Sequence, residues 1–160
     1  MSEHSPQQPL LPDHQLFAVL GEEGFARIVY LFYEKVKQDD ILGPMYRASP
    51  EAAHAPDMET HMHDAEVRLR DFLVGRFGGP QRYVQMRGHP RLRMRHMPFR
   101  IDVNARNRWV ELISESINEA QLDENASASL AHYLAQIATF LINADEPDEQ
   151  GSVVDLPISR

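Results

Sequence analysis

The sequence predicts an all-α fold, and three features of the chain support this prediction. Apolar residues recur with the three- and four-residue spacing of amphipathic helices in several long stretches. Alternating apolar and polar runs flanked by hairpin turns, which would indicate strands, do not occur. Gly88, Pro90 and Pro98 interrupt residues 81–98, so only short helices fit there. We therefore expect about four main helices, with an irregular segment between the second and the third.

The first helix is expected to begin near Leu16, after a polar, proline-containing extension at residues 1–13 that should be flexible. Gly43-Pro44 is the expected stop signal at its other end. Side chains spaced for one buried face mark this helix, and they are Phe25, Ile28, Val29, Phe32, Tyr33 and Val36.

The second helix is expected after a loop at residues 47–58 that is rich in alanine, proline and serine. It should run from about Asp57 to Phe77, where Gly78-Gly79-Pro80 would end it. Its apolar positions are Ala65, Val67, Leu69, Phe72 and Leu73.

Each of the last two long helices can begin at an aspartate that caps its N-terminus. Asp102 would cap a helix that extends to about Ala120, and Asp123 would cap the final one, whose apolar stripe runs over residues 130–142. We expect the acidic tail at residues 146–160 to be flexible. A chain of 160 residues should form one domain, here residues 14–145 between the two extensions.

Composition excludes several kinds of chemistry. The chain has no cysteine, which rules out disulfides, cysteine nucleophiles, cysteine-ligated zinc, iron–sulfur clusters and haem attached through cysteine. It also lacks a Walker-type loop, a dinucleotide-binding glycine fingerprint and the common hydrolase motifs. No run approaches the ~18 apolar residues of a membrane helix, and the N-terminus does not resemble a signal peptide. We therefore expect a cytoplasmic protein without a membrane partner.

The arginines are concentrated in one part of an acidic chain. The net charge is -8, yet residues 82–108 contain eight arginines and a single acidic residue, Asp102, which gives this segment a charge of +7. Few aromatic residues lie between the arginines, so we expect no nucleic-acid partner. The segment suits a small carboxylate or phosphate ligand. An alternative function is therefore a non-haem helical module that binds an acidic partner through residues 82–108.

His96, at the end of this arginine-rich run, has the setting of an axial haem ligand. A ligand imidazole binds iron through one nitrogen and usually donates the other N–H to a carbonyl or carboxylate. Because Pro98 has no N–H, carbonyls of the preceding turn lack partners, and that of Leu92 is one candidate acceptor. The alternative is a partly exposed histidine stabilised by a helix dipole. Arg93 and Arg95 could bind haem propionates, or form an ordinary solvated surface.

Tyr33, Tyr46 and Trp109 carry polar hydrogens on large aromatic side chains. Such groups can donate to bound dioxygen, which carries partial negative charge, although the residues alone favour ordinary core packing. His61 and His63 form only a weak metal signal, because positions i and i+2 do not share a helical face.

The chain resembles the truncated haemoglobins of group II. The resemblance rests on Gly78-Gly79-Pro80-x-x-Tyr83, on the block Gly88-His89-Pro90-Arg91-Leu92-Arg93-Met94-Arg95-His96-x-Pro98-Phe99 and on Trp109, and it extends from about Phe17 to Asn143. It implies a two-over-two helical sandwich around haem b that binds dioxygen, nitric oxide, carbon monoxide or other small ligands. It leaves open nitric oxide dioxygenase or peroxidase-like activity, an unidentified reductant, a role in oxygen transport and a homodimer.

The resemblance also implies a role for individual residues. His96 matches the proximal iron ligand, and the residues that match cofactor contacts are Arg95, Arg93, Tyr83, Arg68, Phe99, Leu69 and Phe72. The distal ligand pocket would consist of Tyr33, Tyr46, Trp109, Ala65 and Leu69. The chain departs from the family in a longer segment at residues 47–63. His61 or His63 could therefore serve as a sixth iron ligand, or the segment could simply cover the pocket rim.

Overall fold

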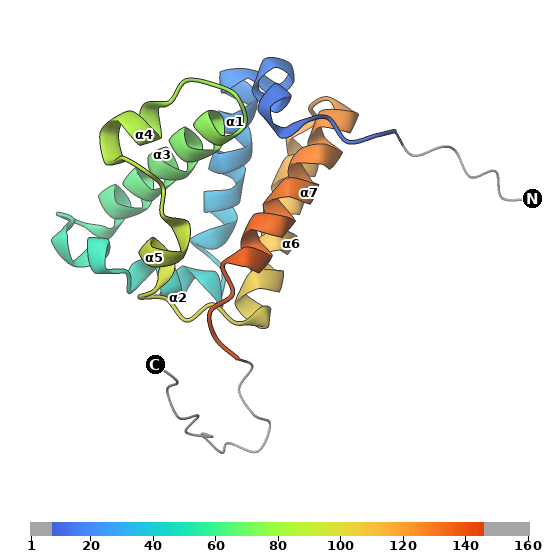
Figure 1. Ribbon diagram of the computed structural model, residues 1–160. Coiled ribbons are helices and arrows are strands. Elements are labelled where there is room, and N and C mark those ends of the chain that lie inside the picture. The colour runs from blue at the N-terminus through green and yellow to red at the C-terminus, as the bar shows by residue number, and fades with distance from the viewer. Residues whose placement is uncertain (1–7, 146–160) are drawn as a thin grey trace, which may run out of the picture.

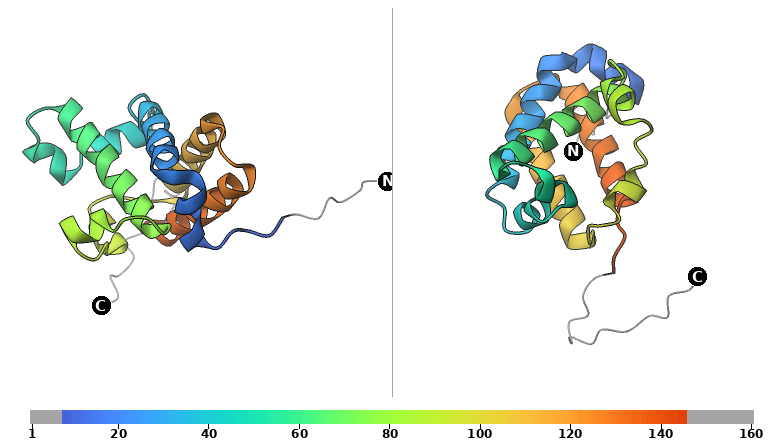
Figure 2. Two further views of the ribbon diagram at one scale, coloured as in Figure 1. Left: turned by 90° about the horizontal axis from the view of Figure 1, so that it is seen from above. Right: turned by 90° about the vertical axis from the view of Figure 1, so that its left-hand side faces the viewer.

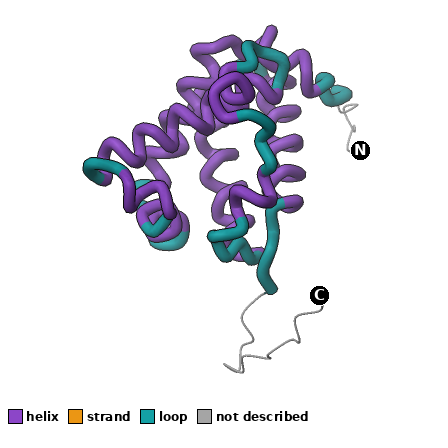
Figure 3. Tube along the Cα trace, turned by 60° about the vertical axis from the view of Figure 1, so that its left-hand side comes forward, coloured by secondary structure: helices purple, strands orange, loops and turns teal. Residues whose placement is uncertain are grey.

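The computed structural model describes residues 8–145, and helices dominate this range (Figure 3). In chain order the elements are η1 (Asp13–Gln15), α1 (Leu16–Val36), α2 (Leu42–Arg47), η2 (Pro50–His54), α3 (Met58–Arg76), α4 (Arg82–Arg87), α5 (Leu92–His96), α6 (Val103–Ala120) and α7 (Glu124–Phe140). No strand occurs within residues 8–145, so the all-α prediction is confirmed. Within the same range, no helix has the length and apolarity needed to cross a bilayer.

The four long helices form two pairs, α1 with α3 and α6 with α7, and α1 also packs on α6 (Figures 1 and 2). Several residues of α1 between the pairs are fully buried, with Phe25, Ile28 and Phe32 at 0% exposure. The short helices α2, α4 and α5 lie around the ends of these pairs (Figure 1). This is the arrangement of a two-over-two sandwich.

Aspartate caps fix where the later helices begin. The Asp102 side chain accepts the N–H of Ala105 at 2.8 Å, and that of Asp123 accepts the N–H of Ala126 at 2.9 Å. Each carboxylate satisfies an N–H that the first helical turn leaves without an intrahelical partner. Both predicted caps are therefore confirmed.

The turn after α3 shows why two consecutive glycines stand there. Gly78 has φ 103°, in the left-handed region, and a Cβ at this position would collide with the carbonyl of His14. A Cβ on Gly79 would lie 2.7 Å from the ring of Phe17 and from Val74. The glycines thus let the end of α3 close over the start of α1.

The connection from α1 to α3 differs from the sequence prediction. Gly43-Pro44 does not end the first helix, which stops at Val36, but lies inside the first turn of α2. Proline is tolerated there because the first-turn N–H groups have no intrahelical partner in any case. The expected loop at residues 47–58 contains the 3₁₀ helix η2. In α1 itself, Gly21 adopts φ 72° and kinks the helix.

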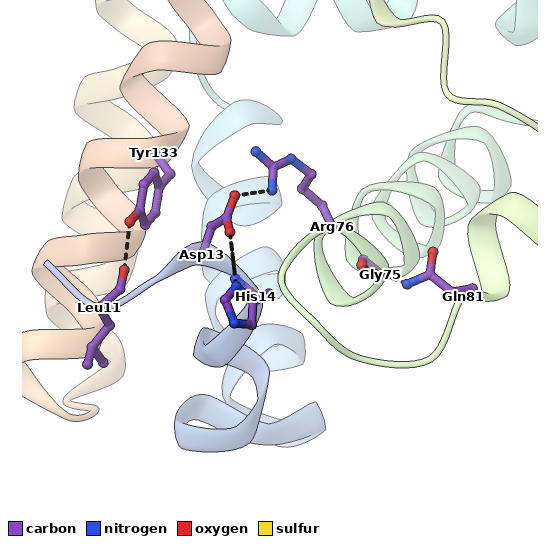
Figure 4. A network of polar contacts seen from close by, with 7 residues as sticks. All are labelled: Leu11, Asp13, His14, Gly75, Arg76, Gln81 and Tyr133. Atoms are coloured by element: carbon purple, nitrogen blue, oxygen red, sulfur yellow. Dashed lines mark hydrogen bonds and ion pairs between the residues drawn. The ribbon is translucent and has the colours of Figure 1, made fainter.

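The N-terminal segment is held more firmly than expected (Figure 4). The hydroxyl of Tyr133 donates to the carbonyl of Leu11 at 2.6 Å, and the N–H of Leu11 donates to Ser129 Oγ at 2.9 Å. Asp13 pairs with Arg76 at 2.7 Å. The extension expected to be flexible through residue 13 is therefore anchored to α3 and α7 from Leu11 onward. Residues 1–7 and the predicted tail at 146–160 lie outside the described residues.

Asp39 joins α2 to α6 through a buried carboxylate. Its Oδ2 accepts the N–H of Leu42 at 2.8 Å and that of Ile41 at 3.1 Å, while its Oδ1 accepts Arg108 Nε at 2.6 Å. Burial by itself raises the pKa of Asp39. The hydrogen bonds from Leu42, Arg108 and Ile41 outweigh burial and hold the pKa below its ordinary value of 3.8.

We expect Asp39→Asn to lower the free energy of unfolding by about 1.5–3 kcal/mol at neutral pH, because the bonds from Arg108 and the backbone lose a charged acceptor. A depressed folded-state pKa stabilises the protein above the unfolded pKa and ceases to do so as pH falls through the folded value. The difference between variant and parent should therefore shrink below about pH 4. Urea unfolding across this range measures it.

Glu34→Gln is the matched control for Asp39→Asn, because Glu34 pairs with Lys37 at an exposed position. We expect this substitution to change the free energy of unfolding by less than about 1 kcal/mol. Equal losses in the two variants would contradict the structural role assigned to the Asp39 carboxylate.

Candidate functional site

A cavity lies between the two helix pairs and is bordered by α2, α4 and α5. Nearly all residues predicted for the site line it, namely His96, Arg95, Tyr83, Arg68, Phe99, Leu69, Phe72, Tyr33, Tyr46, Trp109, Ala65 and His61. Arg93 and His63 do not. These residues come from six different helices and the segment after α5, so only the folded chain brings them together.

His96 presents one free ring nitrogen in the cavity wall. Its Nδ1 lies 2.7 Å from the carbonyl oxygen of Leu92. Because a carbonyl can only accept, Nδ1 carries a proton, and in the neutral imidazole Nε2 then carries the lone pair. Within residues 8–145, Nε2 has no hydrogen-bond partner. The prediction that Leu92 accepts the second imidazole proton is confirmed, and this contact fixes the tautomer that an iron ligand requires.

Asn143 holds the segment of His96 against the end of α7. Its Nδ2 donates to the carbonyls of Phe99 at 2.9 Å and of His96 at 3.3 Å, and its Oδ1 accepts the N–H of Ile101 at 2.8 Å. One amide side chain thereby satisfies three backbone groups around the short helix α5. Sequence reasoning missed this role, because nothing local to residues 92–99 indicates a partner so distant in the chain.

Three aromatic side chains with polar hydrogens line another part of the cavity. The rings of Tyr33 and Tyr46 meet edge to face at 5.6 Å between centroids, and Trp109 packs against Phe32 at 5.4 Å. Burial raises the pKa of Tyr33 well above its ordinary value, and the neighbouring Tyr46 adds to this shift. Burial also raises the pKa of Tyr46. Both phenols therefore keep their protons at neutral pH and can act as donors.

Part of the cavity wall formed by α3 is apolar. Ala65, Leu69 and Phe72 line it at intervals of three and four residues, as one face of a helix requires. Ala65 is the smallest of them, and it leaves room beside the aromatic donors. The ring of Phe72 meets that of Tyr83 from α4 at 5.7 Å between centroids, which closes this side.

The predicted pair of carboxylate-binding arginines is divided between two surfaces. Arg95 lines the cavity, and its side chain donates to the carbonyls of Pro90 at 2.8 Å and Arg87 at 2.9 Å. Arg93 lies outside the cavity, with its guanidinium 4.8 Å from the ring centroid of Phe140. Positions i and i+2 of a helix point in different directions, so both could not face one ligand. Arg68, Arg87 and Arg106 also line the cavity, and the last two were not predicted.

The two histidines considered as sixth iron ligands have different surroundings. His61 is 2% exposed and lines the cavity, where its Nε2 lies 2.8 Å from the carbonyl oxygen of Tyr46. His63 is exposed. Sequence reasoning also missed Ser49, which lines the cavity beside His61.

The donor set fits a haem better than a bare metal ion. In the described part of the chain, no three His, Cys, Asp or Glu side chains gather as a ligand set for an ion. The cavity instead offers the His96 imidazole with its free Nε2, several apolar side chains and several guanidinium groups. These groups suit, in turn, an axial ligand site, a flat apolar ring and carboxylates.

A model of the bacterial-like globin family matches residues 15–143. The chain belongs to this family. The globin is 37% identical to a solved structure, a thermostable haemoglobin from Thermobifida fusca, with a TM-score of 0.70 and coverage of 80% of this chain and 96% of that one. A haemoglobin from Chloroflexus aurantiacus is 33% identical, with a TM-score of 0.69 and coverage of 85% and 99%.

Curated relatives agree with the structural comparison. A group 2 truncated haemoglobin of Bacillus subtilis is 25% identical over 136 residues, which cover 85% of this globin and 94% of the relative. The resemblance to group II truncated haemoglobins and the predicted fold are thus confirmed. Membership of this family entails a haem cofactor and the binding of small gaseous ligands such as oxygen.

Proposed function

We propose that this globin holds haem b in the cavity, with His96 Nε2 as the proximal iron ligand, and binds dioxygen reversibly. The observation that carries the proposal is the His96 imidazole, whose Nδ1–H donates to the Leu92 carbonyl and whose Nε2 is free in the cavity wall. Because the chain has no cysteine, the cofactor would be held without covalent links. When bound, the haem supplies an iron that takes up diatomic ligands.

The polypeptide contributes contacts to the cofactor and to its ligand. Arg68, Arg95 and Tyr83 would bind the propionates, because guanidinium and phenol groups donate to carboxylates. Tyr33, Tyr46 and Trp109 would donate to a dioxygen ligand, and the apolar side chains Ala65, Leu69 and Phe72 of α3 would limit competition by water for these donors. Nitric oxide and carbon monoxide are further ligands of the same pocket.

A second activity, the conversion of nitric oxide to nitrate, is favoured by the three donors. Donors that slow the release of dioxygen lengthen the time in which nitric oxide can meet it. One dioxygen, one nitric oxide and one electron give one nitrate, so an external reductant must return an electron after each turnover. A truncated haemoglobin of Bacillus subtilis that is 25% identical to this globin is described as oxygen-avid. Peroxidase-like turnover of hydrogen peroxide is the other reaction that such a site could support.

Absorption spectra of the ferric, ferrous and dioxygen-bound protein test both parts of the proposal, haem binding and dioxygen binding. We expect a Soret band, a five-coordinate ferrous form and a stable dioxygen adduct. Failure of the purified protein to take up haem would overturn the proposal and favour a module that binds an acidic partner through residues 82–108. A six-coordinate ferrous form would instead indicate an internal histidine on iron. His61 would be the first candidate, because it lines the cavity and His63 does not.

Rapid mixing of the dioxygen-bound protein with nitric oxide separates the two reactions. We expect one nitrate per haem, formed much faster than dioxygen dissociates. Hydrogen peroxide turnover with a phenolic reductant is the parallel assay. If nitrate forms no faster than dioxygen leaves, nitric oxide conversion is not a function of this pocket.

A further inference from the structure

We propose that His61 is a positioning residue that holds the backbone of Tyr46 in place and thereby governs how firmly the cavity retains dioxygen. The inference rests on the proposed function, because it requires the Tyr46 hydroxyl to donate to the ligand. It gives a role to the longer segment at residues 47–63, which neither the fold nor the family membership explains.

The contacts of His61 identify its tautomer and its partners. The side chain comes from the first turn of α3 and is 2% exposed. Its Nε2 lies 2.8 Å from the carbonyl oxygen of Tyr46 and 3.1 Å from Ser49 Oγ. A carbonyl oxygen only accepts hydrogen bonds, so Nε2 carries the proton. The N–H of Ser49 donates to the same carbonyl at 3.3 Å, and the imidazole is the closer donor.

The position of the Tyr46 carbonyl leaves it open to a donor in addition to the Ser49 N–H. It belongs to the last turn of α2, a helix of 6 residues, and the carbonyls of a last turn have no intrahelical N–H to accept. So short a helix does not persist without tertiary contacts. His61 supplies such a contact from a different helix, and it couples the end of α2 to the start of α3.

α2 is held at both ends by buried side chains. At its start, the carboxylate of Asp39 accepts the N–H of Leu42 at 2.8 Å, and at its end the imidazole of His61 donates to Tyr46. The Tyr46 ring lies against that of Tyr33 and lines the cavity. Since carbonyl and phenol belong to the same residue, release of the carbonyl would also free the phenol to move.

These contacts oppose the binding of iron through Nε2 of His61. To bind iron through Nε2, the imidazole would have to lose the proton there and both contacts, to Tyr46 and to Ser49. The buried Ser49, at 7% exposure, and the Tyr46 carbonyl would each lose a partner away from water. The structure therefore favours His61 as a support for the distal pocket.

The first test compares His61→Leu with His61→Gln. Leucine fills the space but donates nothing, whereas the glutamine amide can place an N–H near the position of Nε2. We expect His61→Leu to accelerate dioxygen dissociation by about three- to tenfold, the effect of one neutral hydrogen bond. His61→Gln should remain within about twofold of the parent. Acceleration in both variants would overturn the inference, because packing and not donation would then be responsible.

A double-mutant cycle with Tyr46→Phe tests the route of the effect. If His61 acts through the Tyr46 hydroxyl, His61→Leu should have no further effect once that hydroxyl is gone. An equal acceleration in the Tyr46→Phe background would overturn the inference. Should Tyr46→Phe accelerate dissociation while His61→Leu does not, the inference fails but the proposed function stands. No effect of Tyr46→Phe in the parent would overturn both the donor role of Tyr46 and this inference.

The tautomer of His61 gives a readout that does not depend on ligand release. In the carbon monoxide complex, the ring ¹⁵N shifts should show a proton on Nε2 and none on Nδ1. The Ser49 amide, which shares the Tyr46 acceptor, should exchange faster in His61→Leu than in His61→Gln. A proton on Nδ1 alone would exclude donation to the Tyr46 carbonyl. This measurement decides the question even if His61→Leu fails to fold.

Discussion

Replacing His96 with alanine is expected to abolish stable haem binding. The His96 imidazole lines the cavity with its Nε2 free, while its Nδ1 is anchored to the backbone at 2.7 Å from the Leu92 carbonyl. Without it, the cofactor would retain only apolar contacts and the guanidinium groups near Arg95. We expect haem affinity to fall by at least about a hundredfold, or about 2.7 kcal/mol. Soret absorbance after transfer of haem to apomyoglobin measures this loss.

His89→Ala is the matched control for His96→Ala. His89 lies seven residues earlier, is exposed, and accepts the N–H of Arg91 through Nδ1 at 3.1 Å. We expect this variant to bind haem as the parent does. His96→Gly should recover a Soret band on addition of imidazole, because a free imidazole can occupy the vacated place. Retention of haem by His96→Ala with an unchanged ferrous spectrum would assign the proximal role to another residue.

Helix starts were predictable from local sequence, because a cap acts within one turn. Asp102 and Asp123 each precede an apolar stripe, and each accepts the N–H three residues later. The end of α1 was less predictable. Gly43-Pro44 is a typical helix stop signal, yet proline is also common in the first turn of a helix. Asp39 supports a helix start here, because its carboxylate accepts the N–H of Leu42.

Site residues were predictable where they belong to a long sequence motif. They were less predictable where their role depends on the direction in which a side chain points. Arg93 and Arg95 are equivalent in the linear sequence, but a helical turn sends one toward Phe140 and the other toward the cavity. The helical period alone could have shown that both do not face one ligand. Asn143 had no such signal. Its role depends on α7 ending beside α5, which is a property of the tertiary fold.

His61 illustrates a prediction that the structure redirects. Its spacing from His63 gave only a weak indication of metal binding, and the departure from the family at residues 47–63 suggested a role on iron. The structure instead directs its Nε2 to the Tyr46 carbonyl and Ser49. Every residue carries the same backbone carbonyl, so the sequence does not indicate which carbonyl a side chain will bind. Such a contact can be identified only in the folded structure.

Removing single donors from the distal pocket is expected to accelerate dioxygen dissociation strongly. Tyr33→Phe and Trp109→Phe keep an aromatic ring but delete one polar hydrogen each. A hydrogen bond to a charged acceptor is worth about 1.5–3 kcal/mol, so we expect each variant to release dioxygen about ten- to a hundredfold faster. Tyr33 should show the larger effect, since at 3% exposure water is poorly placed to replace its hydroxyl.

Carbon monoxide provides the control for the distal variants. It carries much less negative charge than bound dioxygen, so its dissociation rate should change by less than about threefold in Tyr33→Phe and Trp109→Phe. Tyr30→Phe, which deletes an exposed hydroxyl on the outer face of α1, should change neither rate. If both distal variants release dioxygen within twofold of the parent, these donors do not stabilise the ligand. If the dissociation of both gases accelerates equally, the substitutions have loosened the pocket. That result would contradict the donor role of these residues.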